Sequence, residues 1–194
     1  MPAFNGWSHC MSNTYGTWLP GDPRGFRTRK HREHVEGDYK SPPPKGSYDH
    51  RHEAARQFSS RDPVYLSVDA RRACVEALVY AWIEVHQIEV LSIAVGSCHL
   101  HVLARFQKEI DISKPTPSRG GLREKDPARY YVGIGKERSA KALAAVGLVK
   151  PGGIWAKRGK IVPIKDRQHQ LNVFQYILDH EQEGAAVWSF RDKE

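Results

Sequence analysis

The chain has 194 residues, a length that suits one domain, and 40% of them are hydrophobic, which is enough to bury a core. Thirty lysine and arginine residues against 22 aspartate and glutamate residues give a formal net charge of +8, which favours a polyanionic partner without naming it. The three cysteines include no C-x-x-C pair, so a disulfide framework is not expected. No apolar run approaches the length of a membrane span, so membrane insertion is not expected either. A cytoplasmic location is therefore expected.

The first half of the chain is predicted to hold one strand, a long irregular segment and one helix. Residues 7–19 mix aromatic and small polar side chains and indicate a strand, which ends at a Pro- and Gly-rich break. The basic stretch at about 20–62 shows no sustained period, so it is predicted to be an insertion that is either functional or merely solvated. A helix follows at 68–87, with Ser67 as its N-cap.

The second half is predicted to alternate short strands with helices. The expected elements are strands at 88–95 and 99–106, a helix at 136–146, a short strand at 154–164 and a helix at 166–183. Gly96-Ser97 separates the first two strands and makes them a hairpin. The order predicts a mixed α+β fold with a small antiparallel sheet covered on one face by helices.

The tripeptide His99-Leu100-His101 lies on the second strand of this hairpin. Residues i and i+2 of a strand point to the same face, so the two imidazoles project together while Leu100 projects into the core. Such a pair can share one divalent metal, although two surface histidines would give the same pattern. Cys98 suggests a zinc enzyme as an alternative, but on a regular strand its side chain points away from both histidines.

The last predicted helix carries a tyrosine and a histidine one turn apart. At about 100° per residue, Leu171, Phe174 and Leu178 cluster on one side of this helix and are predicted to face the core. Tyr176 and His180 lie nearly opposite them, on an exposed or cleft-facing side. An ordinary half-buried tyrosine and a surface histidine remain the alternative interpretation.

Together the two segments resemble the HUH endonuclease superfamily, in which two histidines flank a bulky apolar residue. The chain is similar to the single-tyrosine transposases of small bacterial insertion sequences and to the REP-associated tyrosine transposases. The resemblance covers residues 90–106, Gly153-Ile154-Trp155 through Tyr176-Ile177, and Trp18-Leu19-Pro20-Gly21-Asp22. The sequence departs from the family pattern at Gly96-Ser97-Cys98, where Met-Pro usually precedes an acidic or amide residue, and at His180, where Gln is usual.

The resemblance implies a ferredoxin-like or RRM-like fold and a metal-dependent endonuclease and strand transferase that acts on single-stranded or hairpin DNA. Tyr176 would be the nucleophile and would form a 5′-phosphotyrosine. His99, His101 and His180 would bind Mg²⁺ or Mn²⁺. A homodimer is also implied, in which the tyrosine helix of one subunit can complete the site of the other.

Basic side chains are expected to bind the DNA backbone. The candidates are Arg24, Arg27, Arg29 and Lys30 in the basic stretch, and Lys157, Lys160 and Lys165 before the last helix. A non-catalytic nucleic-acid-binding protein that keeps the fold is the alternative function. The sequence does not decide between an active transposase and a domesticated nuclease.

Overall fold

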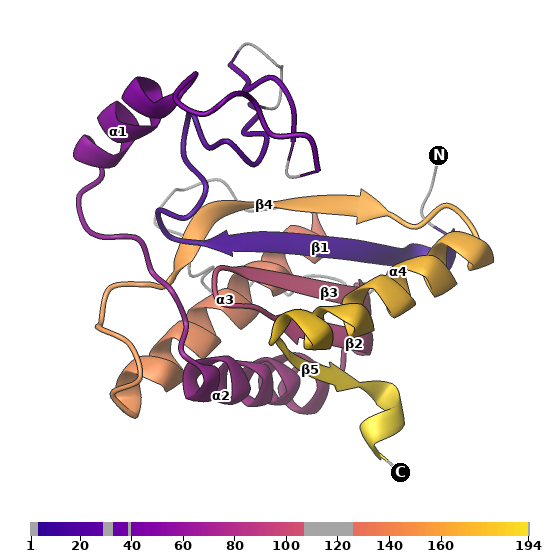
Figure 1. Cartoon of the computed structure of the whole chain (residues 1–194). Helices are drawn as coiled ribbons and strands as arrows, with labels where there is room; N and C mark the ends of the chain where they lie inside the picture. The colour runs from indigo at the N-terminus through magenta and orange to yellow at the C-terminus, as the bar shows by residue number, and fades with distance from the viewer. Residues whose placement is uncertain (1–3, 29–32, 39, 107–125, 194) are drawn as a thin grey trace. The chain divides into compact units, whose positions relative to one another are not determined.

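A computed structural model describes residues 4–28, 33–38, 40–106 and 126–193 (Figure 1). Its helices and strands, in chain order, are η1 (Phe4–Gly6), β1 (Trp7–Thr14), α1 (Asp49–Gln57), α2 (Val68–Val79), η2 (Tyr80–Val85), β2 (Glu89–Val95), β3 (His99–Arg105), α3 (Pro127–Ala145), β4 (Trp155–Pro163), α4 (Arg167–Asp179), η3 (His180–Glu183), β5 (Ala186–Ser189) and η4 (Phe190–Lys193). The segment η2 is a π-helix, and the other η segments are 3-10 helices. Within the described ranges, no helix is both long and apolar enough to cross a membrane.

The chain divides into two compact units. Residues 1–13 and 65–194 form the first unit, and residues 14–64 form the second. The basic stretch predicted at about 20–62 falls within the second unit, where α1 is a helix that its composition did not predict. That the whole chain works as one domain stays a prediction.

The first unit is built around a sheet of five strands in the order β4-β1-β3-β2-β5. Neighbouring strands run antiparallel, as the arrows in Figure 1 show. In the register between β1 and β3, His9 lies opposite Leu103, Met11 opposite His101 and Asn13 opposite His99. Because opposite residues share a face, His9 and Met11 lie on the same side of the sheet as the two histidines of β3.

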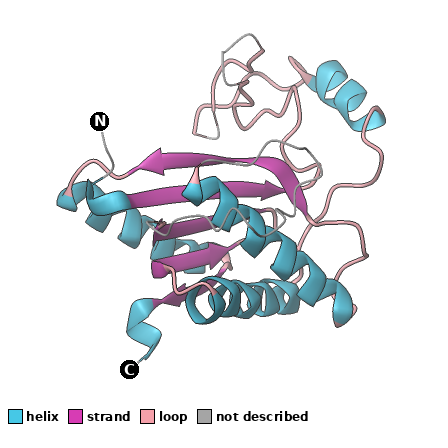
Figure 2. Ribbon diagram, turned by 180° about the vertical axis from the view of Figure 1, so that it is seen from behind, coloured by secondary structure: helices cyan, strands magenta, loops and turns pink. Residues whose placement is uncertain are grey.

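Helices cover both faces of this sheet. Ala94 and Leu103 pack on one face against Val173, Phe174 and Ile177 of α4. Helices α2 and α3 pack together over the other face, to which the fully buried Leu100 and Val102 point (Figures 1 and 2). The predicted α+β class with a small antiparallel sheet is confirmed. The expectation that helices cover one face is wrong, because α4 buries its apolar stripe against the side that carries the histidines.

Helix α4 is rotated relative to the predicted wheel. Its buried residues are Gln170, Val173, Phe174 and Ile177. Leu171, predicted to face the core, is 44% exposed. At about 100° per residue, Val173, Ile177 and position 180 fall along one line of the helix, so His180 continues the buried stripe instead of lying opposite it. His180 is accordingly buried, whereas Tyr176 at the edge of the stripe is half-exposed.

The other predicted elements appear with shifted ends. The β2–β3 hairpin is as predicted, and Ser67 caps α2 by accepting a hydrogen bond from the Ala70 amide at 3.2 Å. Helix α3 begins at Pro127, well before the predicted start at 136, with Asp126 as its N-cap. The short strand β5 was not predicted at all. It pairs with β2 and so becomes an edge of the sheet.

Candidate metal centre

His99 and His101 reach the site from the start of β3. The hairpin before them is closed by a hydrogen bond from the Gly96 amide to the His99 carbonyl at 2.9 Å. A side chain at position 96 would collide with the His99 ring, since a Cβ built there would lie 2.6 Å from Cε1 and 2.8 Å from Nε2. Glycine at this position therefore gives the His99 imidazole the space that it occupies.

His180 reaches the same site from the end of α4, where the helix tightens into the 3-10 turn η3. Its Nδ1 lies 2.8 Å from the carbonyl oxygen of Tyr176, one turn earlier. The chain then reverses at Gly184, whose φ is 80°, and the Ala185 amide donates to the His180 carbonyl at 3.0 Å. Both the backbone and the side chain of His180 are thereby fixed before the chain enters β5.

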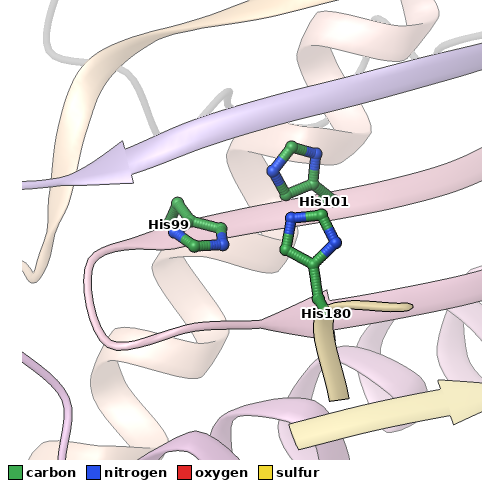
Figure 3. A group of neighbouring side chains, drawn as sticks. All are labelled: His99, His101 and His180. Carbon is green, nitrogen blue, oxygen red and sulfur yellow. The ribbon is translucent and has the colours of Figure 1, made fainter. Parts of the chain in front are cut away.

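These histidines form one cluster. One ring nitrogen from each of His99, His101 and His180 lies within 4.8 Å of the others. In Figure 3 the ring of His180 points towards the rings of His99 and His101. Two nitrogens that bind one ion at about 2.1 Å each lie at most about 4.2 Å apart, so three atoms within 4.8 Å of one another need at most a small movement of the rings to share an ion. The structure therefore brings together the three residues predicted to bind a metal.

The hydrogen bonds of the cluster leave Nε2 as the ligand atom of His180 and engage Nδ1 of His101. A carbonyl oxygen can only accept, so Nδ1 of His180 carries the proton that it donates to Tyr176, and Nε2 of the neutral ring keeps its lone pair. Nδ1 of His101 lies 2.9 Å from Nε2 of His9 and is likewise engaged. Metal-binding histidines commonly use their second nitrogen in this way.

The donor set fits a divalent transition metal. Neutral imidazole is a ligand for Zn²⁺ and other transition metals, whereas Mg²⁺ prefers oxygen. In the described part of the chain, the cluster comprises histidines alone, which favours Mn²⁺ over Mg²⁺. Cys98 is outside it, and its Sγ lies 3.7 Å from Nδ1 of His99. The group of side chains that could share one ion leaves out Cys98, so the arrangement favours the three histidines over the alternative of a zinc site built on Cys98.

Tyr176 lies directly beside this cluster. Its ring centroid is 4.6 Å from that of His180 and 5.4 Å from that of His101, in edge-to-face orientations. With 47% of its surface exposed, the side chain remains accessible to a large substrate. Tyr176 and the histidines belong to the same chain, so the site as described needs no residue from a second copy.

Sequence reasoning missed His9, which lies on β1 beside the cluster. Its ring centroid is 5.2 Å from that of His101 and 6.0 Å from that of Tyr176. Burial, followed by nearby basic side chains, lowers the pKa of His9 to about 4. Burial, followed by the neighbouring histidines, lowers the pKa of His101 to about 2. Both rings are therefore neutral at neutral pH and keep a lone pair.

The predicted DNA-binding residues lie in several places. Lys157, Lys160 and Lys165 are exposed on or just after β4. Lys160 is close enough to His9 for its charge to act on that ring. Trp155 lies two residues before Lys157, and its Nε1–H donates a hydrogen bond to Oγ of Ser139 in α3 at 3.0 Å. Alternation along the strand therefore directs Lys160, together with Arg158, to the face that carries the histidines, and Lys157 to the opposite face.

The basic residues of the second unit are partly engaged within that unit. Arg24 forms an ion pair with the buried carboxylate of Asp22 at 2.5 Å and lies 5.4 Å from the centroid of the Trp18 ring. Arg27 pairs through its backbone with His34 in an isolated antiparallel β-bridge, and its guanidinium group donates to the Gly37 carbonyl at 3.4 Å. Arg29 and Lys30 lie outside the described residues. Arg24 thus contributes to local structure, and a role of these residues in binding DNA stays a prediction.

Comparison with known proteins identifies no family. No family model matches the chain, and no curated protein matches it. The chain is similar to a solved structure described as "REP associates tyrosine transposase bound to a REP hairpin", with 12% identity, a TM-score of 0.42, and coverage of 95% of this chain and 72% of that chain. A similarity of this size establishes neither family nor function, and the geometry of the site stands independently of it.

Proposed function

We propose that the chain is a metal-dependent endonuclease of the HUH type that cuts and rejoins single-stranded DNA, with Tyr176 as its nucleophile. The observation that carries the proposal is the position of an accessible tyrosine ring 4.6 Å from one histidine and 5.4 Å from another in a cluster of three that can hold a metal. Transposition, or the processing of repeat hairpins, would be the setting of this activity, in the cytoplasm.

The reaction exchanges one phosphodiester for another. The phenol of Tyr176 loses its proton and its oxygen forms a bond to phosphorus, the bond from phosphorus to the 3′ oxygen breaks, and that oxygen takes up a proton to give the free 3′-OH. The resulting 5′-phosphotyrosine conserves the ester, so the strand can be resealed or transferred. When bound by His99, His101 and His180, a divalent metal would polarise a phosphoryl oxygen. Neutral imidazoles leave the charge of such an ion undiminished.

The substrate is proposed to be single-stranded DNA or DNA next to a hairpin. An exposed basic strand beside the cluster suits a phosphate backbone, and Lys160 on the face of the histidines is the best-placed contact. A homodimer is also proposed, on resemblance alone. Because one chain supplies Tyr176 and the three histidines, exchange of tyrosine helices between subunits would require Tyr176 to leave the position described above.

The test is capture of the covalent intermediate. Wild-type protein incubated with a library of single-stranded hairpin oligonucleotides and Mn²⁺ should give a protein–DNA adduct that survives denaturing electrophoresis, and Tyr176→Phe should bind DNA without forming it. Tyr80→Phe is the matched control, since Tyr80 is 61% exposed on a different helix. Adduct from Tyr176→Phe at undiminished yield, or cleavage at full rate after chelation of divalent metal, would falsify the proposal. Binding without cleavage by the wild type would favour the non-catalytic alternative.

A further inference from the structure

His9 is a buried histidine that no feature of the proposed reaction uses. It is 7% exposed and lies on the central part of β1, on the same face as the cluster. Its Nε2 is 2.9 Å from Nδ1 of His101, and its ring meets that of Tyr176 at 71°. His9 therefore contacts both a proposed metal ligand and the proposed nucleophile.

His9 is not itself a ligand in this arrangement. Within the described ranges, the group of side chains whose ligand atoms lie within 4.8 Å of one another comprises His99, His101 and His180, without His9. The Nε2 of His9 faces Nδ1 of His101, so Nε2 is the nitrogen of His101 that this contact leaves for an ion. Its hydrogen bond to the three-histidine cluster therefore runs to His101.

The direction of this hydrogen bond decides which nitrogen of His101 is available. A neutral imidazole carries one proton. If His9 donated, the proton of His101 would lie on Nε2 and would block that atom as a ligand. If His101 donates from Nδ1, its Nε2 keeps the lone pair. A ligand role for Nε2 of His101 thus requires His9 to accept.

We propose that His9 is a positioning residue, which accepts a hydrogen bond from Nδ1 of His101 and so holds that ring in the tautomer and orientation that metal binding needs. The inference rests on the proposed metal site and deepens it. It parallels His180, whose Nδ1 is held by the Tyr176 carbonyl. One ligand is thus oriented by the backbone and another by a side chain from a neighbouring strand, as is usual for outer-shell partners of metal-binding histidines.

Three variants of the full chain test the role of His9. His9→Leu removes the acceptor, whereas His9→Gln can place its amide oxygen near the position of Nε2. Met11→Leu changes the next residue on the same face of β1 at nearly constant volume, and so controls for general disturbance of the strand. Thermal melts identify the variants that fold.

Two readouts are used, and one of them is independent of metal. Nitrogen-15 NMR of the metal-free protein should show His101 protonated at Nδ1 in the wild type, in His9→Gln and in Met11→Leu, but partly protonated at Nε2 in His9→Leu. Mn²⁺ affinity, measured from the paramagnetic resonance of the free ion, should fall by about 10- to 100-fold in His9→Leu and largely recover in His9→Gln.

The two proposals fail in different ways. A His9→Leu protein that folds, keeps His101 protonated at Nδ1 and binds Mn²⁺ like the wild type overturns the role of His9. Wild-type protein that binds no Mn²⁺, yet shows the expected tautomers, overturns the metal site while leaving the hydrogen bond established. If His9→Leu does not fold, failure of His9→Gln to keep the Nδ1 proton on His101 overturns the inference.

Discussion

Neighbouring residues of β3 point to opposite faces of the sheet, and the two faces carry different kinds of side chain. Towards α2 and α3 the strand presents Leu100 and Val102, which are at most 1% exposed. Towards α4 it presents His99 and His101 at the end of the strand near the hairpin, and Leu103 further along. One face thus contributes apolar burial, and the other contributes imidazoles supported by an apolar neighbour. Because the faces alternate residue by residue, stability and metal binding should be separable by mutation within a single strand.

The sharpest separation should come from Leu100 and His101. Leu100→Ala removes a fully buried side chain and should lower the free energy of unfolding by about 2–5 kcal/mol. Its folded fraction should bind Mn²⁺ with unchanged affinity. His101→Ala should nearly abolish metal binding while costing less stability. Chemical denaturation and metal titration of both variants measure this. Parallel losses of stability and affinity in the two variants would show that the faces are not independent.

Substitution of His180 tests whether the end of α4 contributes a metal ligand to the two histidines of β3. His180→Ala removes a third ligand and should weaken Mn²⁺ binding by more than about 100-fold, beyond the range that loss of a residue orienting a ligand costs. His180→Gln should stay within about tenfold of wild type, because an amide can also bind a divalent ion. The measurement is metal titration together with cleavage rate. Wild-type affinity in His180→Ala would make His180 an ordinary buried histidine.

Gly96 tests how much the site depends on the space beneath His99. Gly96→Ala should displace the His99 ring, because the added methyl would meet ring atoms at 2.6 and 2.8 Å. We expect a loss of about tenfold in Mn²⁺ affinity. Gly133→Ala is the control, since a Cβ there meets nothing within 4 Å in an exposed turn of α3. If the two variants bind Mn²⁺ equally well, the ring adjusts without cost.

The smallest expected effect is a difference between two lysines of β4 in the salt dependence of DNA binding. Lys160 is expected on the histidine face and Lys157 on the opposite one, and both are exposed. Lys160→Gln should flatten the slope of log affinity for single-stranded DNA against log salt concentration by about 0.7. Lys157→Gln should leave the slope nearly unchanged. Equal slopes in the two variants would mean that DNA does not follow the histidine face.

The sequence predicted the part of the site that depends on local periodicity. His99 and His101 share a face because strands alternate with a period of two, and no knowledge of the remaining fold is needed. The spacing of Tyr176 and His180 follows in the same way from the helical turn. Their joint placement beside the two histidines came from resemblance, since neither period states which strand a helix covers.

The parts that were missed depend on contacts between distant segments. His9 enters the site through the register of β1 against β3, and a register cannot be read from one strand alone. The rotation of α4 was mispredicted because Leu171 and Ile177 are equally apolar, and packing against Ala94 and Leu103 selected Ile177. Strand β5 is four residues long and exists by pairing with β2. A segment that short carries too little pattern of its own.

The hydrogen bond from His180 to the Tyr176 carbonyl links metal binding to fraying of a helix end. The Nδ1 of His180, a proposed ligand, binds the carbonyl of Tyr176 in the last turn of α4 and so ties the side chain of the ligand to the backbone of that turn. A metal held by His180 would resist opening of this turn, because an ion that binds the closed form alone shifts the equilibrium towards it. Amide hydrogen exchange around residues 176–185 would then slow on addition of Mn²⁺, while the interior of α2 would serve as an unchanged reference.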